Sequence, residues 1–250
     1  MLLSMRARTD ALRALALTCA SEMDKARHAE EDDARRRAQA RVDVLIPVVK
    51  AFSTDQPWRS PLWGYRFTVA WGTSRRLAPL SCCATHASRP STRGPMVSRP
   101  WTWPVASWVV MAVLPWRLID DVEATASALA AREELVALGE SLAGGAADLR
   151  VAMAAVLESS RDTQHGEDAI QAFATPFLSL VGHVLCAWQM GRAALVAEAA
   201  LLDGSTDPFY RAKLAAADYA LRHWLPVGRA QRAVIEAGVD GLTHYVPDID

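Results

Sequence analysis

The side chains of this 250-residue chain that could do chemistry are few and scattered. Cys83 and His86 have the spacing of half a zinc site, but no second pair of ligands has matching spacing. His183 and His223 each stand alone in apolar helical sequence, where we expect a hydrogen-bonded core histidine rather than a ligand. There is no glycine-rich phosphate loop and no Ser/His/Asp order. We therefore assign no catalytic, no cofactor-binding and no metal-binding residue.

A basic, tryptophan-rich segment interrupts the chain between Asp55 and Asp120. It contains no acid and no lysine, but it holds eight arginines, seven of the nine tryptophans and eight of the thirteen prolines, so its formal charge is +8 in a chain of net charge −1. Its arginines alternate with aromatic residues in the manner of a nucleic-acid-binding stripe. The tryptophan-rich run at 101–116 is typical of an interfacial anchor, although it is too short to span a membrane. Either a basic module is inserted here, or residues 56–118 were not selected as protein.

The overall composition is that of a folded domain in a reducing compartment. An apolar content of 51% excludes wholesale disorder, and the chain is long enough for one large domain or two small ones. The net charge near zero predicts no general affinity for nucleic acid. The four cysteines lack disulfide or metal spacing, and the apolar start before Arg6 is too short for a signal peptide. We therefore expect a cytoplasmic protein.

Helical periodicity dominates both flanks of the basic segment and predicts an all-α fold. Before the segment we expect helices over 2–27 and 34–52, the second kinked at Pro47. The acidic run at 30–33 is typical of a solvated helix start.

After the segment, a helix should begin at 118, break near Gly144 and Gly145, and resume to residue 157. Two long helices should follow over about 167–202 and 207–237, with bends at Pro176 and Pro226. Asp207 and the proline after it have the residue types of an N-cap and a first helical position.

Residues 174–191 contain no charged side chain and suggest a transmembrane helix. Because proline, histidine and glutamine interrupt the run, and Arg192 and Glu198 follow it closely, we prefer a buried helix. Four apolar-striped segments joined by short breaks predict that residues 118–240 form an antiparallel bundle. The expected core residues are Phe177, Leu180, Val184, Leu185, Trp188 and Leu195, facing Leu214 and Leu221.

Two parts of the chain resemble the acyl-CoA dehydrogenase family. Residues 1–14 and 38–55, which end in a Phe-Ser-Thr-Asp turn, are similar to part of its C-terminal helical domain. Residues 174–182 (Ala-Thr-Pro-Phe-Leu-Ser-Leu-Val-Gly), 209–214 (Phe-Tyr-Arg-Ala-Lys-Leu) and 223–226 (His-Trp-Leu-Pro) resemble the extra C-terminal helical domain of large members, such as the 3-methylmercaptopropionyl-CoA dehydrogenases. The resemblance implies an oxidoreductase in which a carboxylate removes the α-proton of an acyl-CoA while FAD takes hydride from the β-carbon.

Two motifs that this resemblance implies are missing from the printed sequence: a His-Gly-Gly segment near the flavin and a Tyr-Glu-Gly-Thr segment carrying the catalytic glutamate. Both reappear when residues 57–113 are translated with the last base of each codon joined to the first two bases of the next. Residues 64–72 then permit Val-Gln-Val-His-Gly-Gly-Met-Gly, and residues 90–101 permit Ile-Tyr-Glu-Gly-Thr-Asn-Gly-Ile-Gln-Ala-Met. One constant offset restores a continuous segment and explains both the missing acids and the excess tryptophan. We therefore interpret residues 57–117 as frameshifted.

The implied chemistry is consequently incomplete. The codons for the glutamate are read as Thr92 and Arg93, and a guanidinium cannot accept a proton. The residues at 67–70 are bulky where the flavin-side glycines should lie. The resemblance also places the family's N-terminal helical domain and central β-domain upstream of Met1.

We expect three parts: a partial dehydrogenase helical domain (1–55), an irregular out-of-frame segment (56–117) that is poorly ordered over 57–100, and a C-terminal helical domain (118–250).

Two functions stay open at this point. The first is a fragment of an FAD-dependent acyl-CoA dehydrogenase of fatty acid metabolism, which we expect to be inactive and to bind no FAD on its own. Its substrate would be an acyl-CoA, and its helical bundle leaves room for a homo-oligomer, with no nucleic acid and no membrane span. The alternative is a non-enzymatic all-α interaction or membrane-associated protein whose basic, tryptophan-rich loop is genuine. Codon bias at third positions across the segment discriminates between the two.

Overall fold

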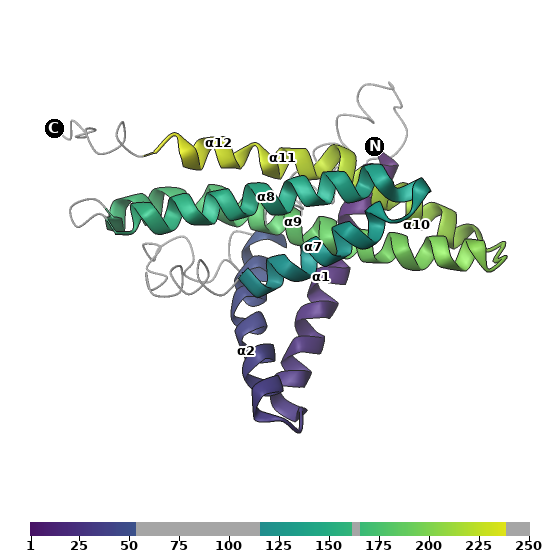
Figure 1. The fold of residues 1–250 in the computed structure, drawn as a ribbon, viewed down its shortest axis with the longest axis horizontal. Helices are drawn as coiled ribbons and strands as arrows, with labels where there is room; N and C mark the ends of the chain where they lie inside the picture. The colour runs from purple at the N-terminus through teal and green to yellow at the C-terminus, as the bar shows by residue number, and fades with distance from the viewer. Residues whose placement is uncertain (54–115, 162–165, 239–250) are drawn as a thin grey trace, which may run out of the picture.

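A computed structural model describes residues 1–53, 116–161 and 166–238 (Figure 1). Within these ranges the regular elements are all helical and no strand occurs, which confirms the all-α class. The segment predicted to be poorly ordered, the Cys83/His86 pair, and Thr92 and Arg93 lie outside the described residues.

The N-terminal part is a helical hairpin that projects from the rest of the protein (Figure 1). A short turn joins α1 (Leu2–His28) to α2 (Asp32–Pro47), which continues into the π-helical turn η1 (Val48–Phe52). Pro47, where the sequence predicts a kink, is the last residue of α2, and the helix type changes from α to π directly after it. Asp32 and Asp33 lie exposed in the first turn of α2, as predicted for a solvated helix start.

The C-terminal part is an antiparallel bundle, as predicted. Its elements are α7 (Trp116–Ala130), the 3-10 turn η2 (Glu133–Leu135), α8 (Val136–Ser159), α9 (Gly166–Leu202), α10 (Pro208–Tyr219), the π-helical turn η3 (Ala220–Trp224), α11 (Leu225–Arg229) and α12 (Gln231–Glu236). Figure 1 shows α8, α9 and the α10–α12 run side by side, with successive segments running in opposite directions. The backbone N–H of Phe209 donates to Asp207 Oδ1 at 2.8 Å, which confirms the N-cap.

The break predicted near Gly144 and Gly145 is wrong. Helix α8 runs through both glycines, and the chain turns earlier, at residues 131–135. Neighbouring side chains come close at this point: a Cβ on Gly145 would lie 3.2 Å from the methyl groups of Leu225, and one on Gly144 would lie 2.9 Å from the guanidinium of Arg229. The glycine pair therefore marks a close packing contact and not a helix end.

Helix α9 lies at the centre of the core and contacts α1, α7, α8, α10, α11 and α12. Residues 180–191 are buried throughout, and the helix continues through Pro176. The predicted core residues Phe177, Leu180, Val184, Leu185, Trp188 and Leu221 are buried, while Leu195 and Leu214 are partly buried against the same core. By length and composition α9 could cross a membrane, but 61% of its most apolar window is buried inside the protein. A core helix accounts for this burial.

Candidate functional site

Three aromatic side chains, which we call the seam, join the N-terminal hairpin to the bundle. The ring of Phe52 meets His183 edge-on, with 4.9 Å between centroids, and stacks on Trp224 at 6.1 Å. His183 and Trp224 are 5.2 Å apart. Two glycines make room for these rings, since a Cβ on Gly182 would lie 2.4 Å from Phe52 and one on Gly228 would lie 2.3 Å from His183. Residues 1–53 and the described residues after position 116 therefore share one packed core.

The two histidines of the bundle have different environments. His183 is buried, and its Nδ1 donates to the carbonyl oxygen of Ser179 at 2.7 Å, which confirms it as a hydrogen-bonded core residue. The same prediction for His223 is wrong. His223 is exposed beside the ring of Tyr219, because η3 turns Leu221 and Trp224 into the core and leaves the residues between them on the solvent side.

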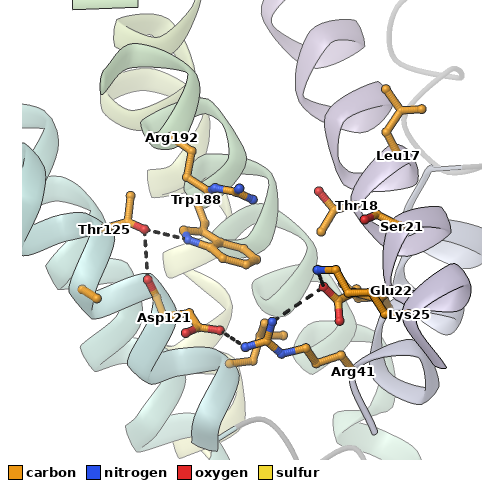
Figure 2. A pocket seen from close by; sticks show the side chains of 13 residues that line it. Leu17, Thr18, Ser21, Glu22, Lys25, Arg41, Asp121, Thr125, Trp188 and Arg192 are labelled. Carbon is orange, nitrogen blue, oxygen red and sulfur yellow. Dashed lines mark hydrogen bonds and ion pairs between the residues drawn. The ribbon is translucent and has the colours of Figure 1, made fainter. Parts of the chain in front are cut away.

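A cleft of about 580 Å³ opens between α1, α2, α7 and α9 (Figure 2). A chain of charged residues crosses it. The buried carboxylate of Glu22 accepts a hydrogen bond from Lys25 Nζ at 2.7 Å and lies 3.7 Å from the guanidinium of Arg41. Arg41 in turn pairs with Asp121. These contacts tie α1, α2 and α7 together at the point where the hairpin leaves the bundle.

The wall of the cleft formed by α9 is polar as well. Trp188 Nε1 donates to Thr125 Oγ1 at 2.9 Å, and Arg192 lies over the Trp188 ring with 5.4 Å between its Cζ and the ring centroid. Arg192 also donates to Gln189 Oε1 at 3.2 Å. A neighbouring pocket of about 780 Å³, between α1, α7, α9 and α10, shares Thr18, Ala124, Thr125 and Arg192 with the cleft. The two hollows therefore meet along these four residues.

Other charged groups form joints between helices. Asp148 of α8 is buried and accepts hydrogen bonds from Arg229 and Arg232. Between α7 and α8, the guanidinium of Arg150 donates to Glu123 at 2.7 Å and holds the pKa of that carboxyl below its usual range. These acids are matched by cations, so they hold helices together and do not offer a free general base.

Metal and thiol chemistry find no support in the described residues. Within residues 1–53, 116–161 and 166–238 no group of three or more histidine, cysteine, aspartate or glutamate side chains could hold a metal ion. Cys19 and Cys186 are buried, and burial raises the pKa of both thiols, so neither is a ready thiolate nucleophile at neutral pH. What this part of the chain offers is a cleft, a pocket and a rigid scaffold.

Comparison with known proteins places the scaffold in a family. Residues 118–245, about half of the chain, match the family "Acetyl-CoA dehydrogenase C-terminal like", and the chain belongs to that family. It is also 32% identical over 255 aligned residues to the 3-methylmercaptopropionyl-CoA dehydrogenase of Ruegeria pomeroyi. The alignment covers 97% of this chain and 41% of that protein. The resemblance found in the sequence is thereby confirmed, and the chain spans well under half the length of the relative it matches.

Proposed function

We propose that this chain is the C-terminal part of an FAD-dependent acyl-CoA dehydrogenase, in which the described helices act as a scaffold for α,β-dehydrogenation of an acyl-CoA thioester. Family membership over residues 118–245 and the alignment to a dehydrogenase over 97% of the chain support this proposal. The proposal includes a cytoplasmic location, a role in fatty acid metabolism and self-association through the bundle.

The described residues do not fit a flavin by themselves. A flavin site needs backbone that the cofactor can approach closely, which is the usual role of glycine in such sites. Here Gly182 and Gly228 are occupied by contacts with Phe52 and His183, and a Cβ on Gly139 would lie 2.6 Å from the backbone of Ala130. We infer that the groups that hold FAD and remove the α-proton come from elsewhere in the proposed whole enzyme.

The packing of the seam is the main support for the proposed scaffold role. Phe52 comes immediately before the Ser-Thr-Asp turn after which the family's His-Gly-Gly segment is expected. Its ring is locked between Gly182, His183 and Trp224. A buried aromatic cluster of this kind has little freedom to move. We infer that the C-terminal helices fix the direction in which the chain enters the flavin side of the active site.

We further propose that the printed sequence is frame-disrupted over 57–117 and inactive. The family match begins at residue 118, where we expect the original frame to return. With arginine at position 93 in place of a carboxylate, proton abstraction from the α-carbon has no base.

The test compares three purified proteins: the chain as it stands, the chain with its frame restored over 57–117, and the restored chain joined to the N-terminal portion of a full-length acyl-CoA dehydrogenase. Only the third should co-elute with flavin absorbance and reduce an electron-accepting dye with an acyl-CoA. Replacing its restored glutamate by glutamine should lower the rate about 10²- to 10⁴-fold while flavin stays bound. Flavin bound by the printed chain would contradict the proposal.

Sequencing the coding DNA tests the alternative of a genuine basic loop. A loop selected as protein would keep the codon bias of its own frame across 57–117, whereas a frameshifted segment would show the bias of the displaced frame. The alternative also includes a membrane-associated protein. Because α9 is largely buried inside the protein, this helix does not support that version.

A further inference from the structure

One ring of the seam, that of Trp224, is contacted from three other helical elements. Phe52 of η1 stacks on it, with 6.1 Å between the ring centroids and 27° between the ring planes. His183 of α9 meets it edge-on at 5.2 Å. From α1, the guanidinium of Arg8 lies over the same ring, with 5.5 Å between its Cζ and the ring centroid. Trp224 therefore joins the bundle to both arms of the hairpin.

The backbone around the seam is unusual on both sides. Phe52 ends the π-helical turn η1, and Trp224 ends the π-helical turn η3. Such turns are rare and occur frequently at functional sites. In η3 the side chains of Arg222 and His223 are exposed, whereas Trp224 is only 2% exposed. The π-helical turn thus directs one large ring into the seam and leaves its two neighbours in solvent.

Arg8 is held at the seam by the ring and not by an acid. Its Nε is buried without a hydrogen-bond partner, and in the part of the chain that the structure describes its guanidinium forms no ion pair. A cation over an indole face is attracted by the charge distribution of the ring, and the attraction grows when water is excluded. Removing the indole would therefore take away the contact of α1 with Trp224 and the stacking of Phe52 at the same time.

We propose that Trp224 is a positioning residue of the proposed dehydrogenase, which acts through Phe52 on the direction of the chain toward the flavin side. The proposal rests on the proposed function. It adds that a residue of the C-terminal helices controls the rate of the chemical step without contact with substrate or flavin. A displacement of about 1 Å caused far from the chemistry can lower a rate about a hundredfold. Loss of the ring that fixes Phe52 should therefore be visible in kcat.

The test uses the restored chain joined to the N-terminal portion of a full-length acyl-CoA dehydrogenase. Trp224→Ala should lower kcat per bound flavin about tenfold to a hundredfold and change KM much less. Trp224→Phe keeps a flat ring against Phe52 and should recover most of the lost rate. The rate is divided by the flavin that co-elutes with each protein, so a role in folding alone would leave this ratio unchanged.

His223→Ala is the matched control, because His223 belongs to the same turn but is exposed. It should leave kcat per bound flavin unchanged. If Trp224→Ala does not fold, Trp224→Leu, which is apolar but lacks a flat ring, should show the same loss of rate.

Two outcomes separate the positioning role from the proposed function. A folded Trp224→Ala or Trp224→Leu protein with kcat per bound flavin within about twofold of the unchanged protein would overturn the positioning role and leave the proposed function standing. A joined protein that binds no flavin and has no activity would contradict the proposed function, and with it the positioning role.

Discussion

The two ends of the α1–α2 hairpin are held in contrasting ways. At the inner end, Ala7, Leu15, Leu45 and Phe52 are buried in the main core, where α1 and η1 contact α9 and α1 also contacts η3. At the outer end, which projects from the bundle in Figure 1, residues 23–37 are mostly exposed, and Arg35–Asp32 and Arg36–Asp33 are exposed ion pairs. Apolar burial stabilises a fold far more than exposed ion pairs do.

This contrast bears on the proposed function. The inner end of the hairpin leads directly into the segment where the family's flavin-side motif is expected. It is also the end that packs against the bundle. The outer end does not lie against the bundle, so changes there should be tolerated. Rigidity is thus concentrated where the proposed active site needs a fixed starting point.

The largest effect should come from removing the ring at the centre of the seam. Phe52→Ala leaves a cavity between His183 and Trp224 and should lower the free energy of unfolding by about 3–5 kcal/mol. Leu17→Ala, on the same hairpin but at a side chain that is 69% exposed, should change it by less than about 0.5 kcal/mol. Denaturant unfolding of both proteins measures the difference, and equal losses would remove the basis for the comparison.

Adding a methyl group to the seam should lower the free energy of unfolding somewhat less than removing the Phe52 ring does. In Gly182→Ala the new methyl would lie 2.4 Å from the Phe52 ring, which is held by packed neighbours and cannot easily yield. We expect a loss of about 1–3 kcal/mol. In Gly191→Ala on the same helix the new methyl would lie 3.0 Å from the end of the Leu129 side chain and 3.4 Å from that of Leu142, a looser fit than at Gly182, so its thermal midpoint should stay closer to that of the unchanged protein.

Ion pairs at the base of the hairpin should contribute a smaller amount that depends on salt. Arg41→Gln removes the link from Glu22 to Asp121, but Lys25 still pairs with Glu22. Because Arg41 and Asp121 are partly exposed, we expect a loss of about 1 kcal/mol at low salt, decreasing as salt is added. A loss as large as that of Phe52→Ala would mean that charge, and not apolar burial, anchors the hairpin.

The smallest effect should be a dependence on pH at the α7–α8 joint. The hydrogen bond from Arg150 lowers the pKa of Glu123 in the folded protein, so the folded state binds fewer protons than the unfolded state as the carboxyl titrates. The resulting stability is present above the unfolded value and is lost as the pH falls through the lowered folded value. Because the Glu123 side chain is 42% exposed, we discount the contribution to under about 1 kcal/mol.

Glu123→Gln should accordingly flatten the acid limb of the stability curve below about pH 5 and leave the seam unaffected. Chemical unfolding at a series of pH values measures this. An acid limb identical to that of the unchanged protein would show that the pair contributes nothing.

The positions of most helices and the N-cap at Asp207 were predictable from the sequence because they depend on local interactions. Apolar spacing, a capping side chain and the missing N–H of proline act within a few residues of the chain. The buried face of α9 followed from the same periodicity. The family followed from short motifs that survive on both sides of the basic segment.

Other features were decided only by the tertiary structure. Three features depend on neighbours that are distant in the sequence. They are the burial of one histidine and not the other, the position of Gly144 and Gly145 inside a helix, and the contact of Phe52 with Trp224. The convergence of Thr18 with Gln189, which are far apart in the sequence, is of the same kind. Burial and pairing belong to the packed assembly of helices, and no single helix carries the information about which surface will cover it.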